Sequence, residues 1–196
     1  MPSAAAIRYR ELASRADVIL KANRRMLGHE EVQAIYGAVL LAQVAAWNAY
    51  VVRLIDCFFQ EVADPSVANF HAIHTLANAA AKSQIERFNT PNAENTRSLI
   101  LRCTGYDPWT DWQWPARKMS ALAVQQRLNE ILKVRHSLAH GSAMPGYAWT
   151  QTPSGATRVT LRTLAWTRAF FNRIVTTTDI GLRSHLHTVY GVVPVW

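Results

Sequence analysis

Apolar residues recur at helical spacing along most of the chain, and the alternation typical of strands is scarce. The uncharged run Ala34–Val52 lies inside a longer segment, Glu30–Ala63, in which Gly37 is the one helix-weakening residue before Asp64-Pro65. A helix that is apolar on all sides belongs in a protein core. We therefore predict an all-α bundle of about five to six helices, with Glu30–Ala63 at its centre.

Capping residues, prolines and glycines bound the remaining helices. We predict them at Ile7–Leu27 (ending at Gly28), Pro65–Phe88, Thr90-Pro91 to about Cys103, Arg117–His140, and Leu161–Thr178 with a continuation to Tyr190 left open. The segment Gly105–Pro115, which carries three tryptophans, is predicted as a loop, and Ser142–Gly155 as a surface loop or short hairpin. No repeat or linker interrupts the chain, so residues 1–196 are predicted to form a single domain.

Basic residues outnumber acidic ones, 21 to 13, and 17 of the 21 are arginine. From Ile131 to Trp196 there are seven basic residues and one acid, so 7 − 1 = +6 of the net +8 lies in the last third. Arginine binds phosphate bidentately and stacks on bases, so an RNA partner explains this skew, although solubility explains it as well. The candidate phosphate contacts are Lys133, Arg158, Arg162 and Arg173, with Arg162, Trp166 and Arg173 near one helix face.

Cellular location is constrained by what the chain lacks. Two cysteines, Cys57 and Cys103, are too few for a disulfide framework or a four-ligand zinc site, which indicates a reducing compartment. We expect no signal peptide, because Met1–Ala6 is followed at once by charged residues, without an apolar run or a cleavage site. The run Ala34–Val52 contains Gln43, Asn48 and six alanines, which favours a buried helix over a membrane span. We therefore expect a cytoplasmic protein without membrane contact or cofactor.

Arg135 interrupts the apolar pattern of Arg117–His140. The predicted buried stripe of this helix consists of Val124, Leu128, Ile131, Leu132, Leu138 and Ala139. Arg135 lies seven residues after Leu128, near the middle of that stripe. We expect such an arginine to pair with a buried acid, to extend its side chain to the surface, or to face an interface or cleft.

His136 and His140 lie four residues apart, beside Arg135. One fixed cation and two imidazoles suit phosphoryl transfer on RNA, because histidine exchanges protons near neutral pH and arginine stabilises a phosphorane. Two alternatives stay open. The histidines could hold a metal, although no third ligand lies nearby in sequence, or they could be structural, with His140 interacting with the helix dipole beside Gly141.

The heptapeptide RHSLAHG, Arg135 to Gly141, resembles the Arg-x4–6-His signature of the HEPN superfamily (higher eukaryote and prokaryote nucleotide-binding domain). The uncharged helix AIYGAVLLAQVAAWNAYV, the segment RFNTPNAEN, the Trp-rich loop and the motif helix together resemble the RiboL-PSP branch of that superfamily. The resemblance spans roughly Leu27–Thr178, most of the chain.

This resemblance implies an all-α bundle and, in catalytic members, metal-independent cleavage of single-stranded RNA in a cleft shared by two protomers. Arg135 and His140 would be the catalytic pair, and His136 the supporting polar residue. The protein would act as a toxin or antiphage-defence effector, for which an antitoxin or regulatory protein is a plausible partner. Ser142 replaces the tyrosine that antitoxin-modified members carry two positions after the motif histidine, so AMPylation there is not implied.

Two other functions fit the same residues. The chain could be a non-catalytic HEPN module that binds RNA, a nucleotide or a protein, because the basic last third fits binding as well as cleavage. It could also be a structural dimerisation partner in which the Arg135 pair serves packing alone.

Overall fold

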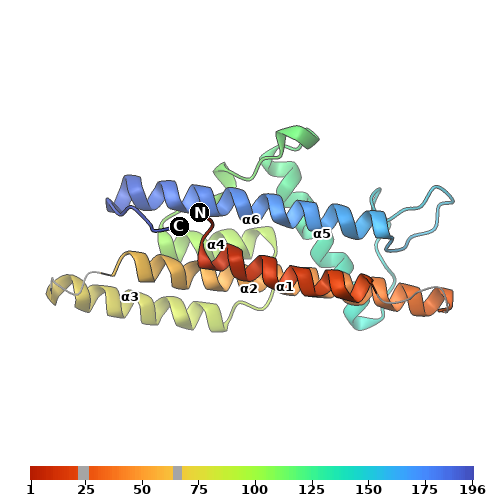
Figure 1. The fold of residues 1–196 in the computed structure, drawn as a ribbon, viewed down its shortest axis with the longest axis horizontal. Coiled ribbons are helices and arrows are strands. Elements are labelled where there is room, and N and C mark those ends of the chain that lie inside the picture. Colours follow the sequence, from red (N-terminus) through yellow and green to blue (C-terminus); the bar gives the residue numbers. More distant parts are fainter. Residues whose placement is uncertain (22–26, 64–67) are drawn as a thin grey trace.

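The computed structural model describes residues 1–21, 27–63 and 68–196. Within these ranges the chain forms helices and no strand, which confirms the predicted all-α bundle (Figure 1). Its elements are α1 (Ala4–Leu20), α2 (His29–Glu61), α3 (Ala68–Glu86), α4 (Ala93–Thr104), the 3₁₀ turns η1 (Pro108–Thr110) and η2 (Pro115–Arg117), α5 (Ala121–His140) and α6 (Leu161–Tyr190).

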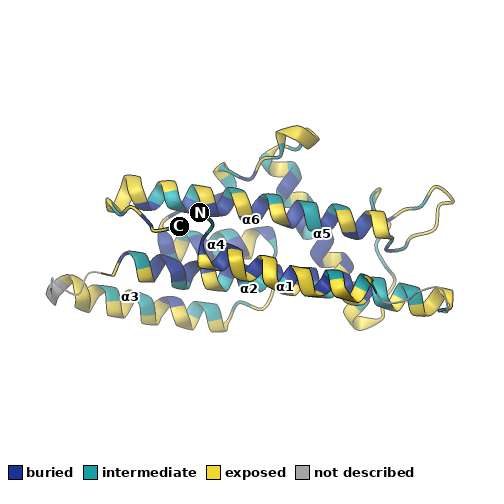
Figure 2. Cartoon of the chain, viewed as in Figure 1, coloured by how far each residue is buried: buried dark blue, intermediate teal, exposed yellow. Residues whose placement is uncertain are grey.

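The long helix α2 is the centre of the bundle, as its all-round apolar pattern predicts. It packs against α1 and α6, and all three run side by side, while α5 crosses them steeply (Figure 1). Trp47 and Tyr50 of α2 are fully buried, and Trp47 packs against both Trp112 and Phe171 of α6. Figure 2 shows the buried faces turned toward one another and α3 largely exposed.

By length and composition α2 could also cross a membrane, with a mean hydropathy of 1.6 over its most apolar 18 residues. However, 56% of that window is buried within the bundle. Gln43 lies in the core, where its side-chain amide donates to the Leu164 carbonyl at 3.3 Å. The apolar character of α2 is therefore accounted for in large part by packing inside the protein.

Helix α1 packs through small residues and one tyrosine rather than through large aliphatic ones. Its buried positions include Ala5, Tyr9, Ala13 and Ala16, whereas Ile7 and Ile19 are exposed. Alanines let two helix backbones approach closely, which explains why α1 uses them against α2. The predicted C-terminal end at Leu27 was wrong: α1 ends at Leu20, and residues 22–26 lie outside the described ranges. Gly28 is the N-cap of α2 instead.

The N-terminal segment is tied to α6 by a buried carboxylate. Asp179 accepts hydrogen bonds from the Ser3 backbone N–H at 2.9 Å and from the Ser3 hydroxyl, and both residues are buried. The Ser3 hydroxyl also caps α1 by accepting from the Ala6 N–H at 3.1 Å. Arg183 donates to the Met1 carbonyl beside this contact. Asp179, the one acid of the basic last third, is therefore a structural residue.

Other helix boundaries differ from the predictions because caps further along the chain prevail. Helix α4 begins at Ala93 with Asn92 as its N-cap, not at Pro91, and α5 begins at Ala121 with Ser120 as its N-cap, not at Arg117. The start predicted at Pro65 falls outside the described residues; α3 is helical from Ala68. Helix α6 does continue to Tyr190 and ends at Gly191.

The three tryptophans of the 105–115 segment pack inward. Trp112 is fully buried, and its indole N–H donates to the Thr178 hydroxyl at 2.8 Å. The Arg97 guanidinium lies over Trp109, with its Cζ atom 4.4 Å from the centre of the Trp109 ring. Trp114 packs against Trp166 and Phe170. Of the two roles that the sequence left open, these contacts match closure of the bundle, because none of the indoles is exposed.

Candidate functional site

Arg135 is exposed, so its predicted place within a buried stripe was wrong. The buried face of α5 runs through Val124, Leu128, Ile131, Val134 and Ser137, mostly in steps of three residues. Each three-residue step turns the buried face by about 60° around an α-helix, so the stripe moves away from Arg135 toward the C-terminal end. Leu138 packs over Gly37 of α2, and Ala139, which the stripe included, is exposed.

Arg135 nevertheless faces a cleft, one of the three outcomes expected from its position. A groove of about 550 Å³ lies between α2, the 89–91 connection and the end of α5. Apolar side chains of α2 such as Leu41 and Val44 form one wall, and Arg135, His136 and Ala139 of α5 form the other. The groove therefore combines an apolar wall with a guanidinium and an imidazole.

A second groove of about 520 Å³ lies on the other side of His136. Lys133, Asn129 and Glu94 line it, and both grooves share Thr90, Leu132 and His136. The amide of Asn129 donates to both carboxylate oxygens of Glu94 at 3.1 Å, so Glu94 already has a partner. His136 thus stands on a ridge between one groove with Arg135 and another with Lys133.

His140 lines neither groove, but its ring lies 4.3 Å from that of His136. Helix α5 stays regular to His140, and Gly141 ends it in the left-handed conformation with φ 64°. In such a helix, positions 135 and 140 point about 140° apart. Within one chain, Arg135 and His140 therefore do not converge on a single phosphate.

The charges of this site are not neutralised by neighbouring groups. Within the described ranges, Arg135, His136 and His140 form no hydrogen bond or ion pair, and all three are exposed. No three His, Cys, Asp or Glu side chains gather as metal ligands in the described part of the chain. The cluster is thus an open cationic surface, available to an anionic ligand.

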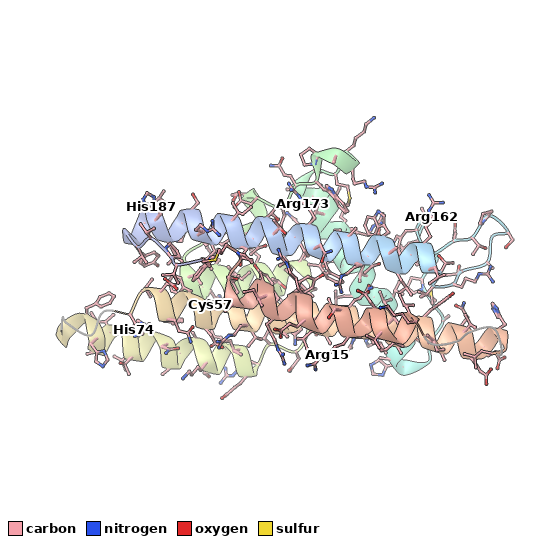
Figure 3. All side chains as sticks on the ribbon, in the orientation of Figure 1. Arg15, Cys57, His74, Arg162, Arg173 and His187 are labelled. Carbon is pink, nitrogen blue, oxygen red and sulfur yellow. The ribbon has the colours of Figure 1, made fainter. Side chains whose placement is uncertain are left out.

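The other predicted phosphate contacts lie in different places. Lys133 borders the motif site, Arg162 lines a cavity with Trp149 and Trp166, and Arg173 lines another cavity near the middle of α6 (Figure 3). Arg158 belongs to the irregular segment before α6, where its backbone N–H donates to Thr150. The strip expected from Arg162, Trp166 and Arg173 is therefore divided, and Trp166 itself stacks on Phe170.

Two polar features of the site were not predicted from the sequence. The Asn48 side-chain oxygen is buried beside the Arg135 groove and has no hydrogen-bond partner among the described residues. Asn129 and Glu94 meet across α4 and α5 beside Lys133. Asn48 interrupts an apolar run, which is a usable signal, whereas the Asn129–Glu94 contact joins residues 35 positions apart and has no local signature.

No family model, curated protein or solved structure matches the chain. The resemblance to HEPN proteins therefore depends on the residues quoted from the sequence alone. The function has to be argued from the geometry of the site.

Proposed function

We propose that this protein is a metal-independent endoribonuclease that cleaves single-stranded RNA and acts as a toxin or antiphage-defence effector. The observation that carries the proposal is the group at the end of α5: Arg135 and His136 line one groove, unpaired, and the His140 ring centre lies 4.3 Å from that of His136. A free guanidinium and an imidazole beside an apolar wall suit a phosphate with an adjoining base.

The proposed reaction is an internal transesterification. One histidine removes the proton from the ribose 2′-hydroxyl, and the 2′-oxygen attacks the adjacent phosphorus. Arg135 stabilises the additional negative charge of the phosphorane. The bond from phosphorus to the 5′-oxygen then breaks, and the histidine, now protonated, returns its proton to that oxygen. The products are a 2′,3′-cyclic phosphate and a free 5′-hydroxyl.

Two copies of the chain are required to bring Arg135 and His140 to the same phosphate, because the two side chains diverge on a regular helix. We infer that the exposed ends of two α5 helices face each other across a two-fold axis, so that Arg135 of one copy and His140 of the other flank one RNA strand. This arrangement leaves His136 to position the His140 ring of its own chain.

A cleavage assay tests the activity. We expect the purified chain to cleave single-stranded RNA in EDTA and to leave 2′,3′-cyclic phosphate ends. Arg135→Ala and His140→Ala should each lower the rate by at least about 100-fold. Arg15→Ala and His187→Ala are matched controls, because Arg15 and His187 are exposed residues on α1 and α6. Full activity in both site variants, with unchanged circular dichroism, would refute the assignment.

Mixing the two inactive variants tests the shared site. A mixed dimer of Arg135→Ala and His140→Ala chains contains one site in which both residues are intact. Random pairing therefore restores roughly a quarter of the wild-type activity if the site is shared between copies. No recovery, in a mixture shown to exchange subunits, would place the whole site within one chain.

One observation favours a second candidate function, a non-catalytic module that binds RNA. His140 lies outside both grooves, whereas Lys133, Arg135 and His136 line them. Such a module would bind RNA without turnover, and its affinity would fall with rising salt concentration. Unchanged RNA affinity in His140→Ala, together with no cleavage by the wild-type chain, would select this candidate.

A further inference from the structure

A separate cavity of about 600 Å³ lies between α6 and the segment that precedes η2. Tyr106 and Asp111 line it from that segment, and Arg173, Ser184 and His185 line it from α6. Figure 3 shows Arg173 near the middle of α6, below this segment. None of the residues that line this cavity lines the two grooves at the end of α5.

Arg173 is held in place by one edge of its guanidinium. Its Nε donates to the Gln113 carbonyl at 3.0 Å, and its two terminal nitrogens have no partner among the described residues. A guanidinium fixed through Nε presents its terminal N–H groups in a definite direction, which suits a carboxylate or a phosphate. The orientation of the Arg173 guanidinium is therefore fixed, and its terminal N–H groups have no anionic partner among the described residues.

Asp111 is the corresponding anion. The Tyr106 hydroxyl donates to Asp111 Oδ2 at 2.5 Å. Burial, and secondly this hydrogen bond, raises the pKa of Tyr106 well above its ordinary value, so Tyr106 keeps its proton and acts as the donor. Oδ1 of Asp111 has no such bond, and no ion pair within 4.0 Å joins Asp111 to Arg173 in the described part of the chain. The two charges share one cavity without neutralising each other by contact.

Gly181 shows that this arrangement is built into α6. A Cβ atom at this position would lie 2.0 Å from the Tyr106 hydroxyl and 2.3 Å from Asp111 Oδ2. Glycine inside a helix is less favourable than alanine, because it has more backbone freedom to lose on folding. The helix accepts this cost at the point where the Tyr106–Asp111 pair approaches its backbone.

His185 and Ser184 add further hydrogen-bonding groups. His185 Nε2 lies 3.1 Å from the Thr104 carbonyl, which can only accept, so Nε2 carries a proton and donates to it. The Ser184 hydroxyl has no partner among the described residues. Either group can bind a polar part of a ligand that the two charges hold in place.

We propose that this cavity binds a small zwitterion, a free α-amino acid, with its carboxylate on Arg173 and its ammonium group on Asp111. A ligand that carries only negative charge would be repelled by Asp111, and one that carries only positive charge by Arg173. A molecule that carries both charges can contact Arg173 through its anionic group and Asp111 through its cationic group. This inference is independent of the proposed ribonuclease activity, because the two sites share no residue.

Calorimetric titration of the full chain with each of the twenty L-amino acids tests the proposal. We expect at least one to bind with a Kd below about 1 mM. The N-acetyl derivative of that amino acid lacks the ammonium group and its methyl ester lacks the carboxylate, so each should bind at least about tenfold more weakly. Binding by none of the twenty, or equal binding of both derivatives, would overturn the proposal, as would tighter binding of inorganic phosphate.

Two variants locate the site. Arg173→Gln and Asp111→Asn should each weaken binding at least about tenfold. Asparagine at position 111 still accepts the Tyr106 hydrogen bond, which keeps the local packing. Arg162→Gln is the control, because Arg162 lies on the same helix and lines a different cavity. Wild-type affinity in folded Arg173→Gln or Asp111→Asn, as checked by circular dichroism, would show that the amino acid binds elsewhere.

Discussion

Helix α5 carries two arginines eight residues apart whose surroundings are opposite. Arg127 is half-buried: its Nε donates to Glu130 at 2.9 Å, and its guanidinium lies 4.5 Å from the centre of the Trp166 ring and 5.5 Å from that of Trp149. Arg135 is exposed and has no partner among the described residues. The same residue type therefore has two roles on this helix: Arg127 contributes to packing, and Arg135 provides an unpaired charge.

The difference follows from what each position faces. Trp149 also donates its indole N–H to Glu130 at 2.9 Å, so Arg127 and Glu130 together attach the irregular 141–160 segment to α5. Burial lowers the pKa of the Arg127 guanidinium, and Glu130 opposes this shift, yet arginine stays charged at any ordinary pH. Arg127 already has an anion and two aromatic partners, so few of its N–H groups are free to bind a ligand. All the N–H groups of the Arg135 guanidinium are free of partners among the described residues.

Replacing each of the two arginines by alanine is the strongest test of this comparison. Arg135→Ala should lower RNA cleavage by at least about 100-fold and change the free energy of unfolding by less than about 0.5 kcal/mol. Arg127→Ala should leave the rate per folded molecule within about threefold of wild type. Cleavage rates and urea unfolding measured on the same preparations check both. An equal loss of cleavage in the two variants would mean that the rate reports folding.

Stability should show the reverse order, with a smaller effect. Arg127→Ala removes the ion pair, the contacts to two indoles and the aliphatic stem, so we expect a loss of about 1–2 kcal/mol in the free energy of unfolding. Arg127→Lys should recover part of it, because lysine keeps the charge and stem but lacks the planar guanidinium. Urea titration followed by tryptophan fluorescence measures the loss. Equal stability of the wild type and Arg127→Ala would contradict the packing role.

A third arginine, Arg97, sharpens the comparison by pH. It binds Asp107 through Nε and a terminal nitrogen and covers Trp109, and its hydrogen bonds lower the pKa of Asp107. A carboxyl group whose pKa is lower in the folded than in the unfolded chain stabilises the fold. This stabilisation is fully present above the unfolded pKa of about 3.9 and is lost as the pH falls through the folded pKa. Asp107→Asn should therefore be less stable than wild type at pH 7, and the difference should shrink below about pH 4. A difference independent of pH would exclude the ion pair as its source.

Helical periodicity was enough to predict the fold class, the central helix and the approximate extent of the other helices. The stripe on α5 was predicted correctly from Val124 to Leu132 and wrongly beyond it, because its short steps depend on where α2 and α4 lie, and a local window assumes a straight face. The grooves beside Arg135 and the charges around Gly181 arise from segments distant in sequence, which no local pattern records.

The contact between Ser3 and Asp179 has a consequence for handling the protein. Met1 is 85% exposed, so an affinity tag joined before it leaves the contact undisturbed. Proteolytic trimming beyond Ser3 removes both hydrogen-bond donors to the Asp179 carboxylate, and a hydrogen bond to a charged group contributes roughly 1.5–3 kcal/mol. The free energy of unfolding of a trimmed preparation therefore depends on whether the residues up to Ser3 are retained.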